Sequence, residues 1–167
     1  MSAESMTADT AVGKLVNEFV TRGAFRAAAL PADKSGSESF SLIWFQNQQM
    51  KLMIDNRQSK VCLVDVLPTI ASRTTIDREL RSWLRERADK KLPEHRRLDP
   101  KTLQAKLTNK SGRMQLTIAS LDNDLLFATR KLLHLTNELY LEFLSAPERY
   151  SWIVESFELD PDNPRWP

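Results

Sequence analysis

Three runs of β-branched and aromatic residues follow one another closely in the first half of the chain, at residues 40–46, 50–55 and 60–66. The polar connections between them are only three or four residues long. A connection this short joins neighbouring strands only when the chain reverses direction, because a parallel crossover needs about a dozen residues or more. The sequence therefore predicts an antiparallel meander over residues 40–66.

A second group of strands is predicted later in the chain. Apolar and polar residues alternate on both sides of the turn at residues 109–112, which predicts a hairpin over residues 103–119. Together with the meander this gives an antiparallel sheet of five or six strands. The sixth strand depends on residues 24–30, whose alanines favour a helix, whereas Gly23 before them and Pro31 after them favour a short strand.

Apolar stripes at helical spacing predict four helices. The first begins after the N-cap residue Thr10, and the others span about residues 75–91, 123–145 and 148–157. The stripe of the long helix at residues 123–145 is broad enough to lie across a sheet. Hairpin-joined strands with helices between and after them are typical of an α+β fold, in which the helices pack on one face of an antiparallel sheet.

The predicted domain organisation follows from these elements. Residues 1–9 are expected to form a flexible leader, and residues 10–157 a single α+β domain of ordinary size. Residues 158–167 contain three prolines. This composition predicts a proline-rich tail without regular structure.

The single cysteine, Cys62, has no partner for an internal disulfide, so nothing in the sequence indicates an oxidising compartment. Its alternation with Val64 and Val66 predicts a small side chain in the core. Residues 1–10 contain no basic residue and no apolar run, unlike a secretory signal. No segment approaches the roughly eighteen apolar residues of a membrane span. We therefore expect a cytoplasmic protein without a membrane partner.

No motif for a cofactor, a metal or catalysis is found. The four glycines are too scattered for the common glycine-rich phosphate loops. One cysteine and two distant histidines, His95 and His134, lack the spacing of metal ligands. Glu138 follows His134 by four residues and could form an acid–base couple with it, but no third residue can be named that would orient the pair. We therefore predict no catalytic residue, no metal and no cofactor.

Charge is distributed unevenly along the chain. Residues 73–120 contain thirteen basic and six acidic side chains, a net charge of +7, whereas residues 121–167 contain four basic and nine acidic ones, a net charge of −5. Opposite charges of this size suggest that the two regions face each other, within one chain or between two. Arg87 falls on the apolar stripe of its helix and needs a carboxylate partner, which the acidic region could supply.

The basic segment at residues 73–113 is the clearest positive signal for binding. Its candidate binding residues are Arg78, Arg81, Arg85, Arg96 and Arg97. The first three fall on one side of their helix, where they are expected to be exposed, and grouped arginines bind phosphates or carboxylates. The alternative is a solvated helix face, because acidic residues interrupt the basic ones and no aromatic ladder accompanies them.

Trp166 is the remaining candidate binding residue. It lies in the proline-rich tail and belongs to no apolar period. An exposed tryptophan is a candidate anchor for a partner protein. A tail that folds back onto its own domain would explain the residue equally well.

The order of elements over about residues 10–145, helix, three strands, helix, two strands and helix, resembles that of bacterial secretion chaperones. This resemblance implies a homodimer that binds unfolded or extended protein segments. The chain differs from those proteins in being basic rather than acidic and in its additional last helix.

Three functions are therefore considered. The sequence favours a non-catalytic protein-binding, adaptor or chaperone-like module whose partner is another protein. The alternative is the binding of nucleic acid or another polyanion through residues 73–113. The third is an enzyme whose carboxylates come from distant parts of the chain, for which the sequence gives no positive sign.

Overall fold

The computed structural model describes residues 10–34, 37–163 and 165–166. These residues contain a six-stranded antiparallel sheet in the order β1-β2-β3-β4-β6-β5. The strands are β1 Arg26–Ala29, β2 Ser39–Trp44, β3 Gln48–Asp55, β4 Lys60–Val64, β5 Leu103–Lys110 and β6 Arg113–Ser120. The predicted meander and hairpin are confirmed, and residues 24–30 contain a strand. The predicted leader at residues 1–9 lies outside the described residues.

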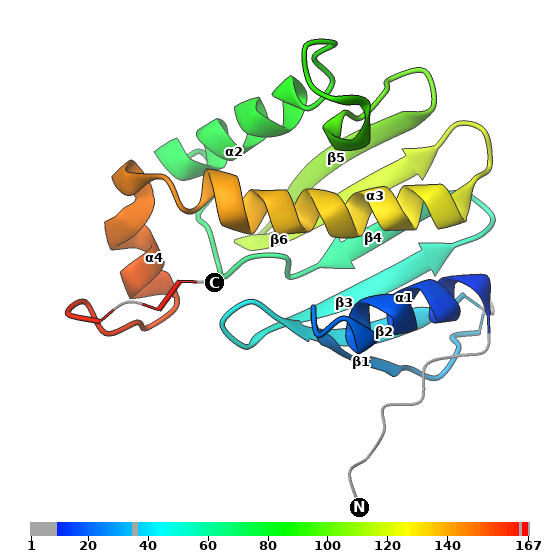
Figure 1. Ribbon diagram of the computed structural model, residues 1–167, viewed down its shortest axis with the longest axis horizontal. Helices are drawn as coiled ribbons and strands as arrows, with labels where there is room; N and C mark the ends of the chain where they lie inside the picture. The colour runs from blue at the N-terminus through cyan, green and yellow to red at the C-terminus, as the bar shows by residue number, and fades with distance from the viewer. Residues whose placement is uncertain (1–9, 35–36, 164, 167) are drawn as a thin grey trace, which may run out of the picture.

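The helices lie on one face of this sheet. The α-helices of the described residues are α1 Ala11–Thr21, α2 Thr75–Glu86, α3 Leu125–Glu138 and α4 Tyr150–Ser156. Shorter helical segments are η1 Glu94–Arg96, η2 Leu139–Phe143 and η3 Pro147–Arg149. Figure 1 shows α1 and α3 side by side across the sheet, with α2 near the β5 edge. The predicted α+β fold is therefore confirmed. Within the described residues, no helix combines the length and the apolar character needed to cross a membrane.

The helix expected at residues 75–91 is shorter than the sequence predicts. It ends at Glu86. The amides of the next residues donate to carbonyls only three residues back, as in the bond from Asp89 to Glu86 at 3.1 Å. Such tighter bonds convert the end of a helix into turns.

The long helix also differs from the expected range of 123–145. Asn123 has a left-handed φ of 58°, so its backbone cannot belong to a right-handed helix. The helix begins after Asp124, which caps it, since its carboxylate accepts the amide N–H of Phe127 at 3.0 Å. The α-helical part ends at Glu138 and continues into the π-helical segment η2.

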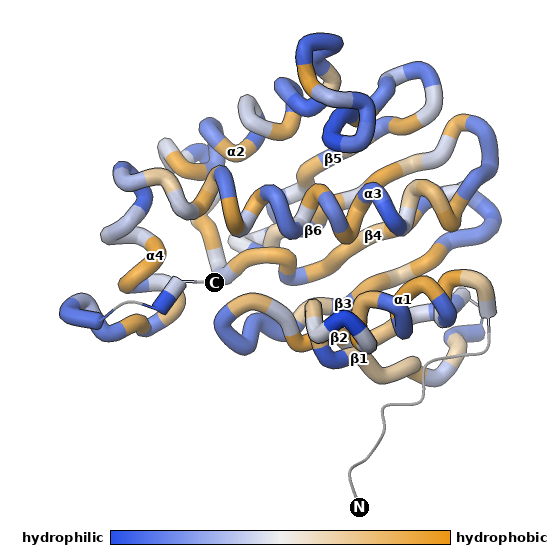
Figure 2. Tube along the Cα trace, viewed as in Figure 1, coloured by the Kyte–Doolittle hydropathy of each residue, from blue (hydrophilic) through white to orange (hydrophobic). Residues whose placement is uncertain are grey.

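The core lies between the sheet and its helices. On four neighbouring strands Phe40, Leu52, Leu63 and Leu116 pair side by side, and all are buried. Along α3, hydrophobic and hydrophilic stretches alternate in Figure 2, as expected for a helix with one face toward a core. The helix-facing side of the sheet is therefore its apolar side.

The opposite side of the sheet, the open face, is not covered by any described helix (Figure 1). It consists of the alternate strand residues Arg26, Ala28, Ser39, Ser41, Ile43, Gln49, Lys51, Met53, Asp55, Lys60, Cys62, Val64, Gln104, Lys106, Thr108, Lys110, Arg113, Gln115, Thr117 and Ala119. All of them are exposed or half-buried.

Cys62 lies on the open face and not in the core. It is half-buried and pairs with Met53 and Thr117 on the neighbouring strands. The predicted common face of Cys62, Val64 and Val66 is wrong, because Asp65 has a left-handed φ of 57° and ends the alternation. Val66 consequently turns to the opposite side and is buried.

The β5–β6 hairpin closes through a two-residue turn, Ser111 and Gly112, with φ values of 54° and 88°. Positive φ at both positions is the geometry that matches the twist of a hairpin. Gly112 is required for a second reason, since a Cβ there would lie 2.5 Å from Cγ2 of Thr69.

We predict that Leu139→Ala lowers the free energy of unfolding by about 2–5 kcal/mol, because Leu139 is a buried core leucine. The control is Leu141→Ala, two residues later, where the side chain is 45% exposed and the expected loss is below about 0.5 kcal/mol. Urea unfolding of both variants measures the difference. Equal losses would show that η2 does not pack on the sheet as described.

Candidate functional site

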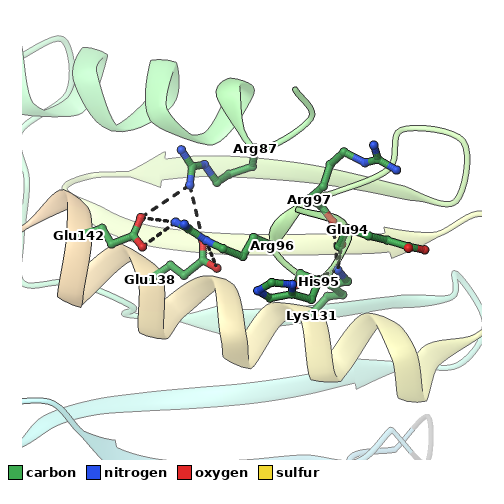
Figure 3. Close-up of polar contacts among 8 residues, drawn as sticks. All are labelled: Arg87, Glu94, His95, Arg96, Arg97, Lys131, Glu138 and Glu142. Atoms are coloured by element: carbon green, nitrogen blue, oxygen red, sulfur yellow. Dashed lines mark hydrogen bonds and ion pairs between the residues drawn. The ribbon is translucent and has the colours of Figure 1, made fainter. Parts of the chain in front are cut away.

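Two arginines from the segment that follows α2 meet two glutamates at the end of α3 (Figure 3). Arg87 Nη1 lies 3.5 Å from Glu138 Oε2 and 3.9 Å from Glu142 Oε2. Arg96 Nε donates to Glu138 Oε1 at 3.2 Å, and its Nη2 binds the carboxylate of Glu142. These four residues, the ion cluster, join the basic and acidic regions within one chain, and Arg87 finds the acidic partner that the sequence required.

The ion cluster is partly withdrawn from water. Arg87 is buried, and its guanidinium lies 4.6 Å from the ring centroid of Trp83, within the range of a cation–π contact. The hydrogen bond and the charge of Glu138 raise the pKa of Arg96. Because both arginines are matched by carboxylates, neither offers a free charge to a phosphate group.

Lys131 holds the chain next to this cluster. Its Nζ donates to the backbone oxygens of Glu94, His95 and Arg97 at 3.1, 3.1 and 3.0 Å. Burial lowers the pKa of Lys131. These bonds fasten the connector, residues 87–102 between α2 and β5, against the middle of α3.

A groove of about 830 Å³ lies between α3 and residues 94–103. Its α3 wall includes Phe127, Arg130, His134 and Asn137, and Leu103 adds an apolar side chain from the start of β5. Phe127 is 40% exposed although it is a large aromatic residue. The groove thus combines apolar side chains with polar groups, as binding sites generally do.

His134 lines the groove, but the suggested acid–base couple with Glu138 is not assembled. The carboxylate of Glu138 is held by Arg87 and Arg96. Burial lowers the pKa of His134, and the charges of Arg130 and Lys131 lower it further. His134 packs edge-on against Phe19, with 5.5 Å between ring centroids. The neutral imidazole is therefore favoured near neutral pH.

The candidate arginines of the basic segment are distributed over three places. Arg78 and Arg85 are exposed on α2. Arg81 was expected beside them on the exposed face, but it is half-buried, contacts Asp77 at 3.4 Å and donates to the carbonyl of Leu107 at 2.8 Å. Arg96 belongs to the ion cluster, and Arg97 lines the groove, although its guanidinium points away from the ion cluster (Figure 3).

Trp166 packs against its own chain. Its indole N–H donates to the backbone oxygen of Tyr140 at 3.2 Å, and the two rings stack with centroids 5.9 Å apart. Phe157 contacts the same indole at 5.1 Å between centroids. Of the two interpretations of Trp166, these contacts favour the tail that folds back.

The groove itself is not among the sites predicted from the sequence. The signal that could have indicated it is the placement of Phe127, His134 and Leu141 at intervals of seven residues, which puts them on one outward side of the helix. In the part of the chain that the structure describes, no three His, Cys, Asp or Glu side chains are grouped as metal ligands.

Comparison of the chain with protein families, with curated proteins and with solved structures found no match in any of the three.

We predict that Glu138→Gln lowers the free energy of unfolding by about 1–3 kcal/mol, because it leaves the buried Arg87 with a weaker partner. The control is Glu18→Gln, which removes a pair with Arg130 in which both side chains are well exposed. This surface pair should contribute less than about 1 kcal/mol. Chemical denaturation compares the two, and a larger loss for Glu18→Gln would contradict a structural role of the cluster.

We predict that His134 titrates below about 6.5, the ordinary histidine pKa. Arg130→Gln should raise that pKa because it removes a neighbouring positive charge, whereas Arg78→Gln should leave it unchanged. Since the unfolded chain binds a proton at His134 more readily, this group makes the fold less stable as the pH falls below about 6.5. NMR titration of the imidazole resonances measures the pKa, and a midpoint above 6.5 would contradict the described environment.

Proposed function

We propose that this chain is a non-catalytic protein-binding module that binds a segment of a partner protein in the groove along α3. The observation that supports this best is the contrast between the charged groups and Phe127. Glu138 and Lys131 are engaged in internal contacts, and Lys131 Nζ also lies 5.5 Å from the ring centroid of Phe127, but this ring remains 40% exposed. Such a site can bind a ligand without a free acid–base pair.

The length of the groove suits a peptide segment. Its α3 wall extends from Phe127 to Glu138, which corresponds to about 16 Å at 1.5 Å per helical residue. An extended segment of about five residues has the same length. The order of elements that resembles secretion chaperones also agrees with a partner bound as an extended segment.

The lining supports recognition of a mixed polar and apolar segment. Phe127 offers an apolar contact, whereas Leu103 at the bottom of the groove is only 2% exposed. Charged side chains of both signs surround Phe127, among them Arg97, Asp99 and Arg130. An apolar centre with a polar rim is the usual arrangement of protein interfaces, in which a buried aromatic often dominates the affinity.

The alternative function, polyanion binding through residues 73–113, has weaker support. Arg81, Arg87 and Arg96 use their charges in contacts within the chain. The exposed arginines that remain on α2, Arg78 and Arg85, do not form a cluster with them. The arginines of α2 and of the connector therefore do not form one basic cluster, and Lys106, Lys110 and Arg113 of the same segment lie apart from them on the open face of the sheet.

The proposal is tested by placing a photo-crosslinking amino acid at position 127 and, as a control, at position 126. Leu126 is equally exposed, at 40%, but does not line the groove. Once a protein crosslinked through position 127 is identified and purified, its affinity for the unmodified chain and for the Phe127→Ala and Leu126→Ala variants is measured.

We expect Phe127→Ala to weaken binding about tenfold, corresponding to about 1.4 kcal/mol, and Leu126→Ala to leave it nearly unchanged. Thermal unfolding shows whether both variants are folded. Equal crosslinking at both positions, or equal affinities of both variants, would exclude the groove as the binding site.

A further inference from the structure

We infer that the open face of the sheet is a second binding surface, and that it binds the acidic C-terminal region of another copy of this chain. This surface is independent of the groove along α3, because it lies on the opposite side of the sheet from the helices. Two observations support the inference: the charge and apolar pattern of the open face, and the matching pattern of the region around α4.

The open face is strongly basic. Its charged residues are Arg26, Lys51, Lys60, Lys106, Lys110, Arg113 and Asp55. Asp55 accepts the amides of Arg57 and Gln58 at 3.0 Å, and Arg113 pairs with Asp65 at 2.6 Å. Lys51 and Lys106, on β3 and β5, form no ion pair with any described residue, so their charges remain available to a partner.

Apolar side chains lie between these lysines. Met53 is 37% exposed, and Cys62 and Val64 continue the patch on the neighbouring strand. In Figure 2, β4 is hydrophobic along most of its length, although only one of its sides faces the helices. A strand that is apolar on both sides is typical of a sheet covered on both faces. The open face therefore has the pattern of a surface that becomes covered.

The region around α4 has the complementary pattern. Tyr150 is 45% exposed at the start of the helix, and Glu155 within the helix and Glu158 after its end are also exposed. Asp160 and Asp162 are also exposed. The four carboxylates of this region are complementary in charge to the lysines of the open face. The ring of Tyr150 is complementary to the apolar patch between those lysines.

A nucleic acid fits the open face less well. Bases are commonly bound by aromatic side chains, and the described strands place no Phe, Tyr or Trp on this face. Backbone phosphates could contact the lysines, but they would not bury the apolar side chains of Met53, Cys62 and Val64. A protein surface can pair with the lysines and bury these apolar side chains at the same time.

The area of the open face indicates how strong the association is. Six strands about 4.8 Å apart make a face about 24 Å wide, and strands of four to eight residues make it about 13 to 27 Å long. This area is at the low end for specific protein interfaces. We therefore expect weak self-association that depends on salt, because exposed charges at its rim are screened.

The test uses two charge-reversed forms of the full chain, one with Lys51→Glu and Lys106→Glu, the other with Glu155→Lys and Glu158→Lys. Sedimentation velocity is measured over a wide range of protein concentration, at salt concentrations of about 0.01 M and about 1 M, where the screening lengths are about 30 Å and about 3 Å. A control with Lys90→Glu and Lys91→Glu has the same change in net charge as the Lys51→Glu and Lys106→Glu form, at exposed positions outside the open face.

The unmodified chain and the control should associate at low salt and dissociate at high salt. Each charge-reversed form should remain monomeric alone, since like charges then meet, and an equimolar mixture of the two should associate again. A chain that stays monomeric at every concentration, or a mixture that stays monomeric, would overturn the proposal. A short DNA duplex is added as a probe, and DNA binding that depends on Lys51 and Lys106 without self-association would also overturn it.

Discussion

The positions of α2 and of the connector depend on one set of opposite charges, Arg87 and Arg96 against Glu138 and Glu142. Removing the guanidinium of Arg87 from water is unfavourable unless carboxylates replace the lost hydration. The two glutamates are one helical turn apart, so both arginines contact the same pair at once. A single helix end thereby binds both the C-terminus of α2 and the connector, which the bond from the Leu98 amide to the Arg87 carbonyl at 2.8 Å also joins.

The groove is a consequence of this arrangement. The connector is held to α3 at Arg96 and again at Lys131, and the groove lies between α3 and residues 94–103. The space left between them is bordered by Phe127 and Leu103. The same contacts engage the charges of Arg96, Lys131 and Glu138 within the chain.

Local patterns were sufficient to predict five strands and the pairing within the meander and within the hairpin, because a period of two and short connections encode both. They left residues 24–30 open between strand and helix, and they did not indicate that β4 pairs with β6. They were also sufficient to show that Arg87 needed an acid. The start of α3 could not be predicted, since the amide of Asp124 is bound by the hydroxyl of Ser120 at the end of β6, a contact made only in the folded chain. The wall of the groove that the connector forms could not be predicted either, because Lys131 holds it through backbone carbonyls, and every residue has one.

The order of the strands has a consequence for how the chain folds. The meander and the β5–β6 hairpin are both local, but β4 pairs with β6 across about fifty intervening residues, as in the pair of Val61 and Ile118. α3 contacts both β4 and β6, the two strands that make this long-range pair (Figure 1). The apolar side of α3 can therefore pack fully on the sheet only after β4 and β6 have paired. We expect the meander and the β5–β6 hairpin to form fast, followed by one slower step in which β4 pairs with β6 and α3 packs on them.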